Sequence, residues 1–178
     1  MKIYDITQEM FSGKVYPGDT APQYTRVKSI EDGNNANVTD MKICVHNGTH
    51  MDAPFHFLSG GRTIDRIELE KCIGEVSVIR SIEDYTGEKR VILLSKVSLD
   101  MKSAGILAES GAWLVGIGDQ SVGDADVHRL ILGKEIVVLE GLKLDGIQPG
   151  KYTLFAAPLK LGGCDGSPCR AVLISGEV

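Results

Sequence analysis

The sequence predicts one β-rich α/β domain, residues 1–178, with a mixed sheet and few short helices. Three observations lead to this fold class. The chain has 178 residues, 43% of them apolar and 24% charged, which suits one domain with a single large core. It contains 21 Gly and 6 Pro, and short apolar runs recur between these turn-forming residues. Helical patterns separate only some of these runs, so parallel and antiparallel strand pairs are both expected.

Eight strands are expected where apolar and β-branched residues are bounded by Gly, Asp or Asn. In chain order they are Gln23–Ile30, Asn37–Val45, Val76–Ile82, Val91–Leu94, Trp113–Ile117, Ile136–Leu139, Tyr152–Ala157 and Ala171–Ile174. A one-turn helix is expected near Ile67–Cys72.

Two longer helices carry recognisable end signals. The first covers Leu99–Ser110 with Ser98 as its N-cap, because a serine hydroxyl can accept a free backbone N–H of the first turn. The second covers Ala125–Leu132, with Asp124 as its N-cap and Gly133 as its stop.

Composition excludes several classes of function. With 24 acidic and 19 basic residues, the net charge of −5 does not suit nucleic-acid binding. No stretch approaches the roughly 20 apolar residues that span a bilayer, and the start, MKIYDITQEM, does not resemble a signal peptide. The four cysteines show no C-x-x-C spacing and are interpreted as reduced thiols. The sequence therefore predicts a cytoplasmic protein without nucleic-acid or membrane partners.

Histidines form the most informative cluster. Three of the four histidines, His46, His50 and His56, fall within eleven residues, with Asp52 among them. Imidazole and carboxylate groups are good ligands for zinc and other first-row ions. Crowding these groups together without a cation would be costly, so the cluster predicts a metal site.

The segment must curl for these side chains to meet. A fully extended strand would spread them over about 33 Å, at roughly 3.3 Å per residue, which is too far for one site. Gly48 allows a positive φ and Pro54 fixes φ, so the bends are expected there. His50 and Asp52 then project to one side as an i, i+2 pair, with His46 brought back over them.

Two more residues are candidates for the same site. His128 lies in the second expected helix, and Glu140 directly follows the apolar strand Ile136–Leu139. Strand ends are where open α/β sheets place their chemistry, so Glu140 is a candidate oxygen ligand and His128 a candidate nitrogen ligand. The alternative, equally open, is that Glu140 makes a salt bridge at the rim and His128 faces solvent.

The segment from His46 to His56 reads His-Asn-Gly-Thr-His-Met-Asp-Ala-Pro-Phe-His. It resembles the signature H-x-G-T-H-x-D-x-P-x-H of the cyclase family of metal-dependent hydrolases, which includes bacterial kynurenine formamidase and isatin hydrolase. Three further features occur in the family's order: Tyr16–Asp19, His128 with Glu140 twelve residues later, and Asp165–Arg170.

The resemblance implies a compact swivelling β/β/α domain with a mixed sheet, assembled as a homodimer or higher homo-oligomer. It also implies one or two divalent ions per chain, zinc or manganese. The implied ligands are His46, His50 and Asp52 for one ion, and Asp52, His128 and Glu140 for the second. His56 is implied as the acid–base histidine and not as a ligand.

Two turn-rich segments flank this motif. Pro17 and Gly18 fit a type II turn, and Tyr16 before them stands where kynurenine formamidases carry Trp, which makes it a candidate substrate contact. The segment Asp165–Arg170 is expected to be a turn in preference to a catalytic segment.

The expected reaction is hydrolysis of a C–N bond in a small amide, formamide or lactam. Divalent ions activate water and polarise a carbonyl, while His56 removes a proton and returns it to the leaving group. Two alternatives remain open: a metal-binding module without turnover, and a ring-closing or dehydrating enzyme that uses the same residues. The presence of His56 argues against the first, because a site without turnover needs no acid–base group.

Overall fold

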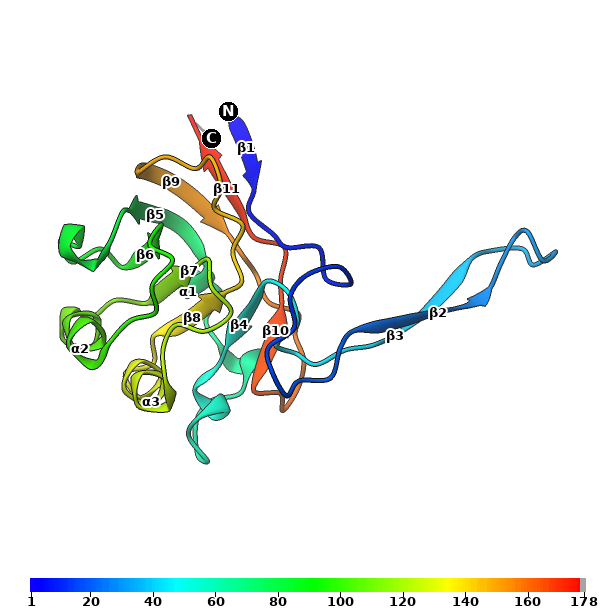
Figure 1. Ribbon diagram of the computed structural model, residues 1–178, viewed down its shortest axis with the longest axis horizontal. Helices are drawn as coiled ribbons and strands as arrows, with labels where there is room; N and C mark the ends of the chain where they lie inside the picture. The colour runs from blue at the N-terminus through cyan, green and yellow to red at the C-terminus, as the bar shows by residue number, and fades with distance from the viewer. Residues whose placement is uncertain (177–178) are drawn as a thin grey trace.

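The computed structural model describes residues 1–176, which form a curled mixed sheet with helices packed on it (Figure 1). The predicted β-rich α/β class is confirmed. The nine strands of the main sheet lie in the order β1 (Lys2–Asp5), β11 (Val172–Ser175), β9 (Gly150–Phe155), β5 (Ile73–Ile79), β6 (Arg90–Leu93), β7 (Leu114–Ile117), β8 (Val137–Glu140), β4 (His50–Asp52) and β10 (Gly166–Pro168). Strands β5 to β8 are mutually parallel, and the other neighbours pair antiparallel.

Two helices connect the parallel strands and lie together on one face of the sheet (Figure 1). Helix α2 (Met101–Ser110) joins β6 to β7, and α3 (Ala125–Gly133) joins β7 to β8. The expected one-turn helix is α1 (Leu69–Cys72), just before β5. The described part of the chain also contains three 3₁₀ turns: η1 (Pro54–His56), η2 (Ile64–Arg66) and η3 (Ile82–Asp84).

One of the predicted helix N-caps is wrong and the other is confirmed. Ser98 is not the N-cap of α2, because the Asp100 carboxylate accepts the backbone N–H of Ser103 at 2.8 Å and begins the helix there. The cap of α3 is confirmed, since the Asp124 side chain accepts two backbone N–H groups of the first turn. Helix α3 ends one residue later than expected and includes Gly133.

Strands β6, β7 and β8 are buried on both faces, as their mainly apolar sequences require, and β5 is buried at Val76–Val78. Along β6, Val91 and Leu93 face the helices and pack in the same cluster as Leu107 of α2. Ile92 points to the opposite face, where its cluster also contains Leu173 from β11 near the far edge of the sheet. Strands distant in the sheet order share this second core, so the sheet curls around it.

Three strands of the main sheet, β1, β4 and β10, were not expected from the sequence. β4 and β10 are each three residues long and gain their pairing from distant segments: His50 lies opposite Glu140 of β8 and also opposite Pro168 of β10. The expectation of a turn over Asp165–Arg170 is therefore wrong, because β10 occupies its middle. The eight expected strands are all present with shifted bounds.

A hairpin projects from the body (Figure 1). It consists of β2 (Gln23–Lys28) and β3 (Val38–Lys42), and every residue of both strands is exposed. Within residues 1–176, no helix is long and apolar enough to cross a membrane.

Candidate metal centre and active site

The loop before β4 is locked against the end of β8. Gly48 has φ +65°, which confirms the expected bend. Gly141 has φ +67°, and a Cβ there would lie 2.4 Å from the carbonyl oxygen of Gly48. The Thr49 hydroxyl donates to the Gly141 carbonyl at 2.6 Å and accepts the Gln8 backbone N–H at 2.8 Å. The Gly-Thr pair of the motif therefore sets the position of the strand that follows.

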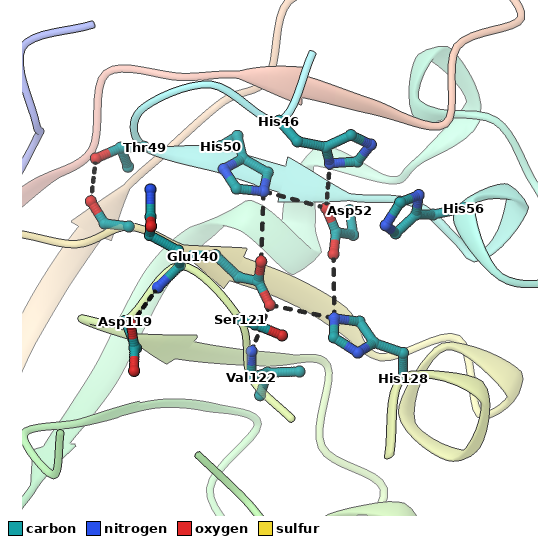
Figure 2. Close-up of polar contacts among 12 residues, drawn as sticks. His46, Thr49, His50, Asp52, His56, Asp119, Ser121, Val122, His128 and Glu140 are labelled. Atoms are coloured by element: carbon teal, nitrogen blue, oxygen red, sulfur yellow. Dashed lines mark hydrogen bonds and ion pairs between the residues drawn. The ribbon is translucent and has the colours of Figure 1, made fainter. Parts of the chain in front are cut away.

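Strand β4 aims His50 and Asp52 at the helix-covered side of the sheet, while Met51 between them enters the opposite core (Figure 2). His50 Nε2 lies 3.5 Å from Asp52 Oδ1 and 3.4 Å from Glu140 Oε2. His50 Nδ1 lies 3.0 Å from the Gly48 carbonyl oxygen, to which it donates. The carbonyl thus fixes the tautomer and leaves Nε2 facing the carboxylates.

Helix α3 supplies His128 in the same manner. Its Nδ1 donates to the carbonyl oxygen of Asp124 at 2.9 Å. Its Nε2 lies 3.3 Å from Glu140 Oε1 and 3.7 Å from Asp52 Oδ2 (Figure 2). Glu140 is further fixed because its Oε1 accepts the Val122 backbone N–H at 2.6 Å.

His46 lies between two carboxylates. Its Nδ1 is 2.9 Å from Asp52 Oδ1, and its Nε2 is 3.0 Å from Asp165 Oδ2. Burial by itself lowers the pKa of His46, but the hydrogen bonds and charges of these two carboxylates outweigh it and raise that pKa from 6.5 to about 9. Burial would raise the pKa of Asp52, yet the neighbouring histidines lower it to about 2.

His56 approaches from the other side of Asp52. Pro54 begins the 3₁₀ turn η1, which confirms the second expected bend and carries His56 away from the β4 line. The His56 ring lies 4.0 Å from the His46 ring between centroids, and its Nδ1 is 3.1 Å from Asp165 Oδ2. Burial is the largest effect on His56 and lowers its pKa, so this imidazole is neutral near pH 7.

A cavity of about 300 Å³ opens onto this cluster. Its wall is made by all four histidines and Glu140, together with Tyr16, Asp19, Phe57 and Ser121. Tyr16 is half-exposed at the cavity, on the expected turn, where the Asp19 N–H donates to the Tyr16 carbonyl at 3.0 Å and Gly18 has φ +102°. Phe57 stacks on the His128 ring with centroids 4.5 Å apart. The volume suits a small molecule.

One buried atom at the centre indicates a cation. Asp52 is fully buried, and among residues 1–176 its Oδ2 has no hydrogen-bond partner. A buried carboxylate oxygen that accepts no hydrogen bond is costly unless a cation lies beside it, and His128 Nε2 approaches this oxygen only to 3.7 Å. Ligand atoms of His50, Asp52 and Glu140 lie within 4.8 Å of one another, and so do those of His46, Asp52 and His56. The donor set therefore fits a divalent ion.

The structure brings every predicted site residue to one place. Glu140 and His128 are 3% and 4% exposed, so the alternative of a rim salt bridge and a solvent-facing histidine is wrong. Sequence reasoning missed Asp165, which contacts two of the histidines. Its signal was the Asp-Gly-Ser-Pro segment in the order of the resembled family, which we interpreted as a turn.

Comparison with known proteins decides the family. The family model described as "Putative cyclase" matches residues 4–118. The chain belongs to the cyclase family. This cyclase-family chain is 32% identical to "Cyclase-like protein 1" of Arabidopsis thaliana, over 97% of this chain and 85% of that protein.

Two further relatives connect the family to hydrolysis. The chain is 30% identical to a protein named "Kynurenine formamidase" from Bacillus anthracis, over 97% of each. A solved structure titled as a potential metal-dependent hydrolase with cyclase activity superimposes with a TM-score of 0.83 at 26% identity, covering 99% of both chains. This cyclase-family protein is accordingly an enzyme of the hydrolase class.

Proposed function

We propose that residues 1–178 act as one metal-dependent hydrolase domain that cleaves the C–N bond of a small amide, formamide or lactam. The observation that carries the proposal is the buried Asp52 carboxylate, which lies among three imidazoles next to a cavity that His56 lines, and whose Oδ2 accepts no hydrogen bond from the described residues 1–176. The named relative from Bacillus anthracis supports the formamide class.

The ligand sets follow the buried nitrogens and oxygens. His46, His50 and Asp52 would hold one divalent ion, and Asp52, His128 and Glu140 would hold a second. The backbone carbonyls on the Nδ1 atoms of His50 and His128 support this, because each leaves Nε2 as the free ligand atom. Nitrogen and oxygen donors without thiolate suit zinc and manganese.

A divalent ion bound there supplies Lewis acidity, which polarises a carbonyl and lowers the pKa of water. His56 takes a proton from the attacking water and passes it to the departing nitrogen, so that water adds at the carbonyl carbon and the C–N bond breaks. The lowered pKa of His56 supports the role of base, because the imidazole is neutral when substrate arrives. Tyr16 is the proposed substrate contact at the cavity mouth.

We also propose a homodimer or higher homo-oligomer in the cytoplasm. An isolated two-stranded hairpin is marginally stable in water, and β2–β3 exposes Tyr24 by 59% and Met41 by 61%. Docking on a second copy would bury these side chains. The four cysteines are free thiols, as expected in a reducing compartment.

Elemental analysis combined with a panel of small formamides, lactams and esters tests the proposal. The protein should carry one or two divalent ions per chain and turn over at least one amide, with products that have gained one water. Wild-type metal content in His50→Ala would contradict the ligand set. Metal without turnover would favour a binding module, and loss of water from a substrate would favour the ring-closing alternative.

A further inference from the structure

The carboxylate of Asp165 is placed by the backbone at a point between two imidazoles. The Ala53 N–H donates to the Asp165 carbonyl at 2.9 Å, and the Ala53 carbonyl accepts the His56 N–H at 2.9 Å. Ala53 is fully buried, so one rigid residue fixes the backbones of both Asp165 and His56. The next residue, Gly166, leaves room for His46, since a Cβ there would lie 2.8 Å from His46 Cε1.

A single oxygen of Asp165 serves both rings. Its Oδ2 lies 3.1 Å from His56 Nδ1 and 3.0 Å from His46 Nε2. An ionised carboxylate only accepts hydrogen bonds, so each of these ring nitrogens carries the hydrogen. In a neutral His56 the other nitrogen, Nε2, is then left with the lone pair.

We propose that Asp165 is a positioning residue for catalysis: it holds neutral His56 in the Nδ1–H tautomer, with the Nε2 lone pair as the base, and orients His46 through the same oxygen. This inference rests on the proposed function, in which His56 moves the proton. It assigns a role to a residue outside the His-Asp motif, more than one hundred positions away in the chain.

The contact differs from an ordinary surface ion pair. Exposed pairs contribute about 0–1 kcal/mol because two flexible side chains must be ordered. Here the Asp165 side chain is 39% exposed, but the His56 and His46 side chains are only 27% and 13% exposed, and the backbones of Asp165 and His56 are tied to the same buried residue. The carboxylate therefore contacts imidazole rings whose positions are already fixed. Its effect is to determine which ring nitrogen carries the proton.

The contact between Asp165 and His46 extends the positioning role of Asp165 to a proposed metal ligand. With its Nε2 hydrogen donated to Asp165, His46 presents Nδ1 toward Asp52. A carboxylate behind a ligating histidine fixes its tautomer and orientation, and removing such a partner typically lowers metal affinity by 10–100-fold. Activity of an Asp165 variant must therefore be measured at saturating metal, and metal content must be measured beside it.

The test is the tautomer of His56 in zinc-loaded protein labelled with ¹⁵N-histidine, at a pH where His56 is neutral. With four histidines in the chain, the His56 signals are assigned by their loss in His56→Asn. The perturbation is Asp165→Asn, whose amide N–H can face Nδ1 and favour the other tautomer. The matched control is Asp65→Asn, because Asp65 accepts the Gly163 N–H at 3.1 Å and supports the same loop without contacting an imidazole.

We expect the Nδ1–H form in wild type and in Asp65→Asn. In Asp165→Asn we expect a shift toward Nε2–H, with kcat lowered by about 10²–10⁴-fold and KM changed by less than about threefold at saturating zinc. A wild-type His56 with its proton on Nε2 overturns the proposal without any variant. An unchanged tautomer or an unchanged kcat in well-folded Asp165→Asn also overturns it. If the wild type turned over none of the amides, the proposed function would be contradicted. The NMR measurement would still show which nitrogen of His56 carries the proton.

Discussion

Metal binding should become tighter as pH rises, because a proton occupies a ligand in the metal-free site. The carboxylates on both sides of His46 hold it as an imidazolium, with a pKa of about 9. A bound ion needs the lone pair of that imidazole, so binding must expel the proton. We therefore predict that the apparent affinity for zinc or manganese increases from pH 6 to 8 and levels off above pH 9.

The magnitude follows from the pKa. At pH 7 the His46 pKa of about 9 lies two units higher, so expelling the proton costs about 2.7 kcal/mol, or about 100-fold in affinity. The expected slope is about tenfold per pH unit between pH 6 and 8 for this proton. The carboxylates also raise the pKa values of His50 and His128 above their usual value despite burial, so proton release should be at least one per chain.

Calorimetric titration in buffers of different ionisation enthalpy counts the protons released at each pH. His56→Asn is the matched control, because burial lowers the pKa of His56 and this residue brings no proton to be expelled. The variant should release the same number of protons as wild type. An affinity that is flat between pH 6 and 8, with no proton released, would refute the argument that His46 bridges the two carboxylates as a cation.

Three further predictions concern the proposed roles. His56→Asn should keep its metal and its circular dichroism spectrum while kcat falls about 10²–10⁴-fold, and loss of metal with activity would make His56 a ligand. Glu140→Gln should lower second-metal occupancy and turnover together, because Gln can still accept the Val122 N–H but lacks the charge. Unchanged metal content and an unchanged rate would show that Glu140 is not a ligand. The double substitution Tyr24→Ser and Met41→Ser should shift the assembly toward monomer in light scattering with metal content intact, and an unchanged mass would exclude the hairpin from the contact.

The main sheet could be predicted where the signal is local. Residues 91–93 of β6 and 114–117 of β7 are continuous apolar runs, and the two strands form a buried parallel pair. Helix α3 has an Asp124 cap and an apolar face, both of which the structure retains. The bend at Gly48 was required by the histidine spacing alone, because ligands cannot meet along an extended strand.

Elements that depend on distant pairing could not be predicted in this way. Residues 50–52 read His-Met-Asp, which has no strand preference, and become β4 because β8 and β10 lie on either side. Asp165 is 119 residues from His46 and 109 from His56, and no local period links them. The available clue was that its segment occurs in the order typical of the family, but the Gly and Pro residues there favoured the interpretation as a turn.

The charges of the site favour an exchange of protons for a divalent ion. Asp52 and Glu140 are buried, and two unpaired buried carboxylates would be strongly destabilising. Before an ion binds, protonated His46 supplies compensating charge beside Asp52, and the carboxylates also raise the pKa values of His50 and His128. A divalent ion would replace the His46 proton, so this histidine would serve as a counter-ion to Asp52 and Asp165 before loading and as a neutral ligand after it. His56, whose pKa is lowered, takes no part in this exchange, which leaves it free to move the proton of the reaction.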